Sequence, residues 1–164
     1  MSHNHNSRTE YCIDEVDKRI LYYLATDARK TGAPDVAEEM DVTAATIRNR
    51  IWQLEAHGIL RGYLADIDYK SIDRYVTYQF RCTVPIPERK RLAQTALEIP
   101  GVTATRELMD GSSNLVITAV GPNTDSITQI ALKLSNRGLE IGDESVVKDK
   151  YHSRYTPFGP EDAP

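Results

Sequence analysis

The chain has 164 residues, which is enough for one ordinary domain or two small ones and too short for most large enzymes. Its formal net charge at pH 7 is −4, so the charge of the whole molecule does not favour binding to phosphate. Any contact with nucleic acid must therefore come from a local basic patch.

Cysteine usage and hydropathy limit the compartment and the chemistry. Cys12 and Cys82 are far apart and form no CxxC pair, so neither a disulfide framework nor a zinc site is expected. No apolar run approaches the roughly 18 residues that span a bilayer, and the N-terminus lacks a signal-peptide hydrophobic region. We therefore expect a cytoplasmic protein without a membrane segment.

The N-terminal part begins with polar residues and then becomes helical. Residues 1–12 show no periodicity and are expected to be a disordered leader, in which His3 and His5 are too few to form a metal site. From residue 13 onward, apolar side chains recur at helical spacing, which predicts a first helix that faces a core. Pro34 then favours the start of a short second helix.

Residues 40–58 predict a third helix, and the rest of the chain is organised around it. Thr43 is a good N-cap, and Gly58 can adopt the left-handed conformation that ends a helix. Its apolar stripe is Ile47, Ile51 and Leu54. Taken alone, this segment is equally compatible with an ordinary amphipathic surface helix. With the two helices before it, however, it predicts a helix-turn-helix.

After Gly58 the pattern changes. Alternating side chains in residues 59–67 predict an exit strand, or wing, and residues 68–74 are expected to be a linker. The two predicted boundaries give a DNA-binding domain at residues 13–67 and a second domain at residues 75–152. Trp52 is expected to pack against the linker, and stacking on a DNA base is the alternative.

The second domain is predicted to have the order strand, helix, strand, strand, helix, strand. Val76, Tyr78, Phe80, Cys82 and Val84 alternate with polar residues, as in a half-buried strand. The tail, residues 153–164, is too rich in proline and polar residues to pack on its own. The predicted class is α+β: a winged helix-turn-helix followed by a ferredoxin-like βαββαβ domain. The six elements span residues 75–84, 88–99, 102–108, 115–120, 124–138 and 139–152.

These two halves together resemble the Lrp/AsnC family of leucine-responsive, or feast/famine, transcriptional regulators, and in particular an archaeal member. The similarity covers roughly residues 13–152. Its most specific part is residues 43–63, with Leu54-Glu55, Gly58-Ile59 and Arg61-Gly62-Tyr63. The resemblance implies a DNA-binding protein that acts as a homodimer or a higher homo-oligomer. In that family the C-terminal sheets pack together, which would cover the polar face of residues 75–84; a solvated face is the alternative.

The sequence departs from the family at the turn that usually binds small effectors such as amino acids. The family has a glycine followed shortly by an aromatic residue and an acid, whereas Asn114 replaces the acid in this chain. An amide cannot offer a carboxylate to an ammonium group, so amino-acid sensing is in question. The candidate effector residues are Gly111, Ser112, Ser113 and Asn114, although the same residues also make a good β-turn.

We expect double-stranded DNA to be the partner and the third helix to read it. Arg48 and Asn49 have donors and acceptors that distinguish base edges, whereas Arg50 and Arg61 are expected to contact the phosphate backbone. The full candidate set is Thr43, Ala44, Ala45, Thr46, Arg48, Asn49, Arg50 and Arg61.

Two other classes of function compete with this interpretation. His57 and His152 have no evident partner motif and no Gly-rich phosphate loop is present, so we expect no enzyme, no cofactor and no metal. The remaining alternative is a winged-helix protein-interaction adaptor that does not read DNA sequence.

Overall fold

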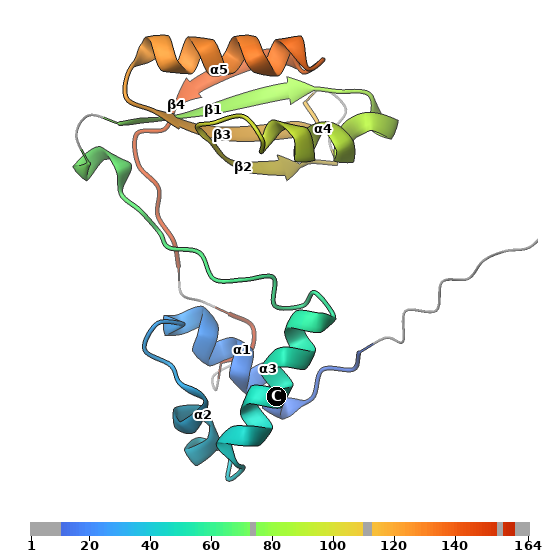
Figure 1. The fold of residues 1–164 in the computed structure, drawn as a ribbon, viewed down its shortest axis with the longest axis vertical. Helices are drawn as coiled ribbons and strands as arrows, with labels where there is room; N and C mark the ends of the chain where they lie inside the picture. Colours follow the sequence, from blue (N-terminus) through green and yellow to red (C-terminus); the bar gives the residue numbers. More distant parts are fainter. Residues whose placement is uncertain (1–10, 73–74, 110–112, 154–155, 160–164) are drawn as a thin grey trace, which may run out of the picture. The chain divides into compact units, whose positions relative to one another are not determined.

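The computed structural model describes residues 11–72, 75–109, 113–153 and 156–159. The chain forms two compact units, whose helices and strands are labelled in Figure 1. The first unit comprises Met1–Ala65 together with His152–Pro164, and the second comprises Asp66–Tyr151. We describe each unit by itself.

Three helices build the first unit, in agreement with the sequence. They are α1 (Glu15–Asp27), α2 (Ala33–Glu39) and α3 (Ala44–Ala56). Pro34 lies in the first turn of α2, where its missing N–H has no helical partner to lose. The apolar stripes meet in one small core, whose buried members are Ile20, Val36, Ala37, Ile47 and Leu54.

The boundaries of α3 follow from local chemistry. Asp41 adopts a positive φ of 51° in the tight turn after α2, a conformation that Asp tolerates better than most residues. Thr43 caps the helix, because its side chain accepts a hydrogen bond from Thr46 N–H. Gly58 has a φ of 69°, and the N–H of Ile59 donates to the carbonyl of Leu54 at 2.9 Å. These features form the hydrogen-bonded C-cap that the sequence predicts.

The predicted exit strand is wrong. Within the described residues of the first unit, the chain from Arg61 onward is extended but pairs with no strand, and a short 3-10 helix, η1 (Tyr69–Ser71), follows in the second unit. Alternation marks a strand only where a neighbouring strand takes its hydrogen bonds. From Arg61 to Ile67 the side chains are exposed: Leu64 is 99% exposed and Ile67 44% exposed.

The second unit is a four-stranded antiparallel sheet with helices, as predicted. Its strands are β1 (Val76–Thr83), β2 (Val102–Glu107), β3 (Leu115–Gly121) and β4 (Glu140–Val146), in the order β2-β3-β1-β4. A 3-10 turn, η2 (Ile86–Glu88), leads into α4 (Arg89–Ala96), and α5 (Thr124–Asn136) precedes β4. This is the βαββαβ arrangement, and the α+β class is confirmed.

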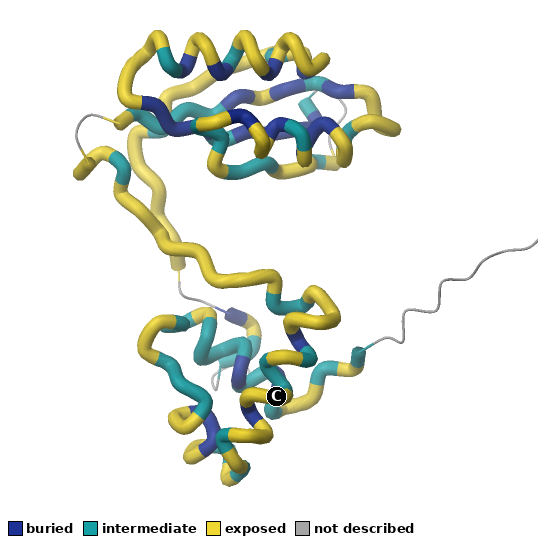
Figure 2. Tube along the Cα trace, viewed as in Figure 1, coloured by how far each residue is buried: buried dark blue, intermediate teal, exposed yellow. Residues whose placement is uncertain are grey.

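Register and burial divide the sheet into two faces. Phe80 is opposite Ile117 and Cys82 is opposite Leu115, and all four side chains are buried with α4 and α5. Burial raises the pKa of the Cys82 thiol to about 11, so it stays protonated and inert. Figure 2 shows the buried side of α5 facing the sheet. The opposite face carries no helix in the described part of the chain and includes Thr77, Gln79, Arg81, Val116 and Thr118.

The C-terminal tail was not expected to pack on its own, and its residues 156–159 pack on the first unit instead. They belong to the first unit, and Thr156 is only 8% exposed. The composition of the tail, considered alone, gave no sign of the apolar surface that receives it. Among the described residues, each helix is too short or too polar to cross a membrane.

Candidate nucleic-acid interface

One face of α3 points away from the core of the first unit. Ile47 and Leu54 are buried, whereas Arg48, Asn49 and Trp52 are exposed. These three residues are separated by one and three positions, so they share one face of the helix. Within the described part of the chain, neither Arg48 nor Asn49 forms a side-chain hydrogen bond or ion pair. Both side chains are therefore available to a partner.

The first turn of α3 has the features of a phosphate-binding end. Thr43 and Thr46 are exposed, and their hydroxyls lie 2.9 Å apart. Ala44 and Ala45 are small, and their backbone N–H groups come before the first helical hydrogen bond, so they are not used within the helix. Exposed amides at a helix N-terminus attract anions, and short side chains allow close approach.

Arg50 lies on a different side of the helix from Arg48. Its guanidinium is 2.8 Å from Asp14 and 3.4 Å from the buried Asp17 of α1. The expected role in phosphate contact therefore does not fit its surroundings, because two carboxylates already hold the guanidinium. Two helical positions rotate a side chain by about 200°, which places Arg50 against α1 while Arg48 faces solvent.

Asp17 is the centre of a polar network between α1 and α3. Its side chain is fully buried, and Oδ2 accepts hydrogen bonds from Tyr11 Oη at 3.0 Å and from the backbone N–H of Asp14 at 3.2 Å. Asp14 in turn accepts from the N–H of Asp17, which completes a capping box. Among the described residues, Oδ1 of Asp17 has no hydrogen-bond partner. The network fixes the start of α1 against α3 and so selects the face that α3 presents.

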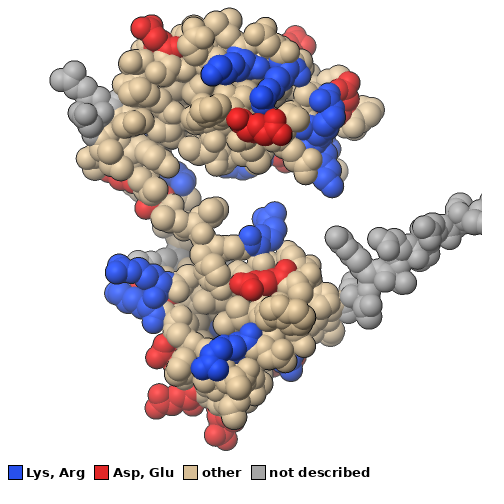
Figure 3. Space-filling model, viewed as in Figure 1, with Lys and Arg blue, Asp and Glu red and all other residues tan. Residues whose placement is uncertain are grey.

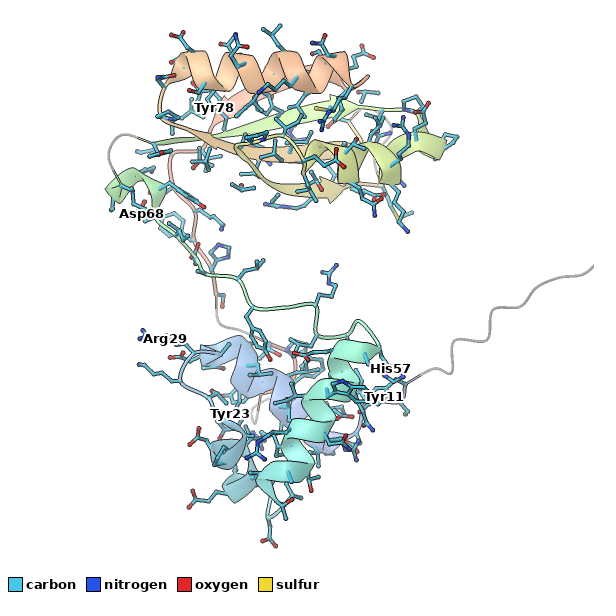
Figure 4. The ribbon with its side chains drawn as sticks, in the orientation of Figure 1. Tyr11, Tyr23, Arg29, His57, Asp68 and Tyr78 are labelled. Carbon is cyan, nitrogen blue, oxygen red and sulfur yellow. The ribbon has the colours of Figure 1, made fainter. Side chains whose placement is uncertain are left out.

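Tyr11 extends the network to the far end of α3, so the expected disordered leader is wrong at this residue, while residues 1–10 lie outside the described part of the chain. Its hydroxyl lies 3.3 Å from Oε1 of Gln53, and its ring centroid lies 4.6 Å from that of His57 (Figure 4). Burial raises the pKa of the Tyr11 hydroxyl, and the neighbouring Asp17 carboxylate adds to the increase. Burial opposes ionisation of Asp14, but the N–H of Asp17 and the Arg50 guanidinium outweigh it and lower the pKa of Asp14. The carboxylate and the guanidinium are both charged at neutral pH.

Arg61 supplies a second cation beyond the end of α3. It is exposed and has no ion-pair partner among the residues that the structure describes. Gly62 follows with a φ of 136°, which favours glycine at this bend in the chain. Acids of α2 lie in the same unit, and Figure 3 shows charges of both signs on the visible face. The interface is therefore a local feature of a mixed surface, as the net charge requires.

The turn before β3 differs from the expected effector site. Asn114 is buried; its Oδ1 accepts from Val84 N–H at 3.0 Å, and its Nδ2 donates to the Val84 carbonyl at 2.7 Å. The carboxamide thus ties the turn to the end of β1 and is not available to a ligand. Gly111 and Ser112 lie outside the described residues. Ser113 Oγ is buried and has no hydrogen-bond partner in the described part of the chain.

The sequence analysis predicted neither the exposure of Trp52 nor the role of Asp17, which is buried behind the interface. Trp52 does not pack as expected and is 64% exposed. Its spacing from Arg48 and Asn49 was the signal that placed it on the same face. Asp17 gave no such signal beyond its position in an acidic first turn, because its partners lie on another helix. In the described residues, no group of three or more His, Cys, Asp or Glu side chains could hold a metal ion.

Comparison with known proteins identifies the family. No protein-family model matches the sequence. The chain is 29% identical over 136 residues to the HTH-type transcriptional regulator LysM of Saccharolobus solfataricus, which covers 82% of this chain and 92% of the relative. It is 31% identical over 109 residues to the HTH-type transcriptional regulator LrpA of Pyrococcus horikoshii, covering 66% of this chain and 74% of the relative. The chain belongs to the Lrp/AsnC family of transcriptional regulators.

Solved structures support the same fold for this Lrp/AsnC regulator. The leucine response regulatory protein of Mycobacterium tuberculosis superimposes with a TM-score of 0.72 at 14% identity, covering 88% of this chain and 98% of that one. A Neisseria meningitidis transcriptional regulator, solved as a complex with L-Met, gives a TM-score of 0.67 at 22% identity and covers 89% of this chain and 97% of its own. The family membership favours a DNA-binding regulator over the adaptor alternative, and the relatives are regulators rather than enzymes.

Proposed function

We propose that this regulator reads operator DNA with the outward face of α3. In this proposal residues 13–67 form the DNA-binding domain, residues 68–74 the linker and residues 75–152 the oligomerisation domain. Arg48 and Asn49 contact base edges in the major groove. Thr43, Thr46 and the amides of Ala44 and Ala45 contact phosphate, as does Arg61. Arg50 positions α3 through Asp14 and Asp17 instead of contacting DNA.

The observation that carries this proposal is the freedom of Arg48 and Asn49. Both are exposed beside a capped helix N-terminus, and no described side chain competes for their hydrogen-bonding groups. By contrast, Arg50 lies two positions further along α3 and is held by two carboxylates. Arginine paired with guanine and asparagine paired with adenine are the side-chain and base combinations best suited to direct readout.

A dimer formed through the helix-free face of the sheet would supply two copies of α3. This face carries Gln79 and Thr118 at its centre and Arg81 beside Val116 one register step away. Antiparallel sheets tolerate a polar solvated face, but a second copy of the same face would bury these side chains symmetrically. The operator should then contain two related half-sites separated by about 34 Å, one helical turn of DNA.

Mapping the sites that the protein occupies across its genome, followed by footprinting, tests this proposal. We expect pseudo-palindromic sites with two protected half-sites about one turn apart. Protection of one isolated half-site at saturating protein would contradict the dimer. Occupancy without any shared sequence would contradict direct readout by α3.

A substitution on the sheet tests the dimer separately. Thr118→Arg places a cation at the centre of the helix-free face, next to its own charged neighbour Arg81 and opposite a second copy. We expect light scattering to show a smaller assembly, together with weaker operator binding. The matched control is Thr128→Arg on the exposed side of α5, where Thr128 bonds only to the Thr124 carbonyl. Equal masses for the two variants would argue against this interface.

We further propose a free amino acid as the effector, bound to the second unit near Ser113. The L-Met complex of the Neisseria regulator motivates the ligand class. Among the candidate effector residues in the described chain, Ser113 has a hydroxyl without a hydrogen-bond partner, whereas the Asn114 carboxamide is already used. Calorimetric titration with the common amino acids should find at least one ligand whose affinity falls in Ser113→Ala. A full panel without detectable heat would reject the proposal.

A further inference from the structure

The C-terminal segment Thr156–Gly159 forms part of the DNA-binding unit, although it follows the second unit in sequence. The chain leaves the first unit after Ala65 and returns to it at His152. Thr156 is 8% exposed, and Phe158 and Gly159 are half-buried. We call the described residues 156–159 the strap.

The strap lies against a small apolar hollow in the first unit. Leu21 and Leu24 of α1 line one part of this hollow. Leu60 and Tyr63 line another part and belong to residues 59–65, which we call the exit segment. Thr156 and Phe158 complete the lining, and the remaining volume is about 330 Å³. The half-buried ring of Phe158 therefore covers apolar surface that would otherwise face water.

The backbone of the strap is arranged as a compact turn. The N–H of Phe158 donates to Thr156 Oγ1 at 3.3 Å, and the N–H of Gly159 donates to the Thr156 carbonyl at 3.4 Å. Pro157 restricts its own φ between these residues. A turn that is already restricted loses less conformational entropy when it docks, which favours a defined contact over a loosely associated tail.

The chain stretches on either side of the second unit run next to each other. Lys70 Nζ lies 2.8 Å from Asp149, and Lys150 Nζ lies 3.3 Å from Asp66. All four side chains are at least 45% exposed, so each pair contributes little by itself. The pairs nevertheless align the outgoing chain after Ala65 with the returning chain that leads from β4 to the strap.

We propose that the strap is a docked intramolecular anchor, which completes the DNA-binding unit and attaches it to the second unit at a second point. The strap occupies the hollow that α1 and the exit segment of the same chain form. Docking of the strap does not depend on the proposed function.

The only tryptophan of the chain makes the docking directly measurable. Trp52 lies on α3 of the first unit, so its fluorescence follows the unfolding of that unit. We expect Phe158→Ala to lower the Trp52 melting temperature by about 5 °C, as removal of a partly buried aromatic side chain from a small unit should. Phe158→Leu should recover most of this loss. The control is Tyr151→Ala, which removes an aromatic side chain that is 89% exposed and should leave the melting temperature unchanged.

Hydrogen exchange gives a second, independent readout on the full chain. In Phe158→Ala, the hydrogen-bonded amides of Ile59, Leu60 and α1, which lie beside the hollow, should exchange several-fold faster, while those of β1 and β3 keep their wild-type rates. Equal melting temperatures for Phe158→Ala and Tyr151→Ala, with unchanged exchange at Ile59, Leu60 and α1, would overturn the anchor. Neither readout uses DNA, so the proposed anchor and the proposed DNA reading are tested independently of each other.

Discussion

The two units of the molecule are stabilised in different ways. Among the residues that the structure describes, 14 buried apolar side chains form one core between the sheet and the helices of the second unit, whereas the core of the first unit has five. The smaller unit instead contains a buried carboxylate and an ion pair between α1 and α3. It also contains the C-terminal strap. A unit that must leave one face of a short helix in solvent has few side chains left for a core. Single polar residues therefore matter more in the first unit than in the second.

Truncating the centre of the larger core gives the largest expected effect and sets the scale for this comparison. Phe80 is fully buried in the middle of β1, so Phe80→Ala should cost the second unit about 4 kcal/mol. Far-UV circular dichroism should show an early transition of the sheet, while Trp52 fluorescence changes much less. Ile86→Ala, at a side chain that is 74% exposed, is the control. An identical shift of both transitions would show that the units do not unfold separately.

Removing one carboxylate should have nearly as large an effect on the first unit. Asp17→Ala removes the acceptor for Tyr11 and Asp14 N–H and one partner of Arg50, which together should cost about 3 kcal/mol. The measurement is thermal unfolding followed by Trp52 fluorescence.

Asp35→Ala is the matched control for Asp17. Asp35 occupies the same third position of α2 and also accepts a backbone N–H, that of Gly32, but it is exposed. We expect this variant to lose about 1 kcal/mol, as for an exposed capping interaction. If both aspartate variants melt at the same temperature, the buried network contributes nothing beyond a cap.

The polar clamp of the second unit tests whether a single polar residue also matters there. Asn114→Asp keeps the shape of the side chain but removes the donor to the Val84 carbonyl and buries a charge, so it should cost about 2 kcal/mol. The same substitution at Asn123, the exposed N-cap of α5, should be neutral, because an aspartate also caps a helix. If Asn114→Asp is as stable as Asn123→Asp, the turn accepts an acid and the clamp is unimportant.

Lowering the pH should reduce the stability of the first unit by a smaller amount, through protonation of Asp14. The pKa of Asp14 is lowered in the folded protein, so its contribution is present above the unfolded value of 3.8 and is lost as the pH falls through the lower folded value. Because Asp14 is partly exposed, we expect less than about 1 kcal/mol. Denaturant unfolding of the wild type and Asp14→Asn at pH 7 and pH 3 measures it. A stability difference that persists unchanged at pH 3 would contradict this assignment.

Local patterns in the sequence predict most of the architecture. Helical spacing and caps give α1 and α3, and alternation gives β1 with its buried Phe80 and Cys82, because these features depend on nearby residues. The predicted exit strand was wrong because a strand also depends on a distant partner. In the described chain, residues 59–67 have no neighbouring strand to pair with.

The parts of the site that could not be predicted depend on contacts between distant residues. Arg48 and Arg50 look alike in sequence, and only the position of α1 makes one free and the other an ion-pair partner. Asn114 is likewise a plausible ligand residue until the end of β1 is placed beside it. The strap escaped prediction because its composition alone does not reveal the hollow formed by α1 and the exit segment.

The most direct test of the account compares Arg48→Ala with Arg61→Ala in binding to the mapped operator and to random DNA over a range of salt concentrations. We expect Arg48→Ala to lose about 1–3 kcal/mol on the operator and to bind operator and random DNA more equally. Arg61→Ala should weaken binding to both DNAs alike and reduce the salt slope by about one phosphate contact. If the two variants lose the same affinity on both DNAs, then α3 does not read the sequence in the way that its exposed face indicates.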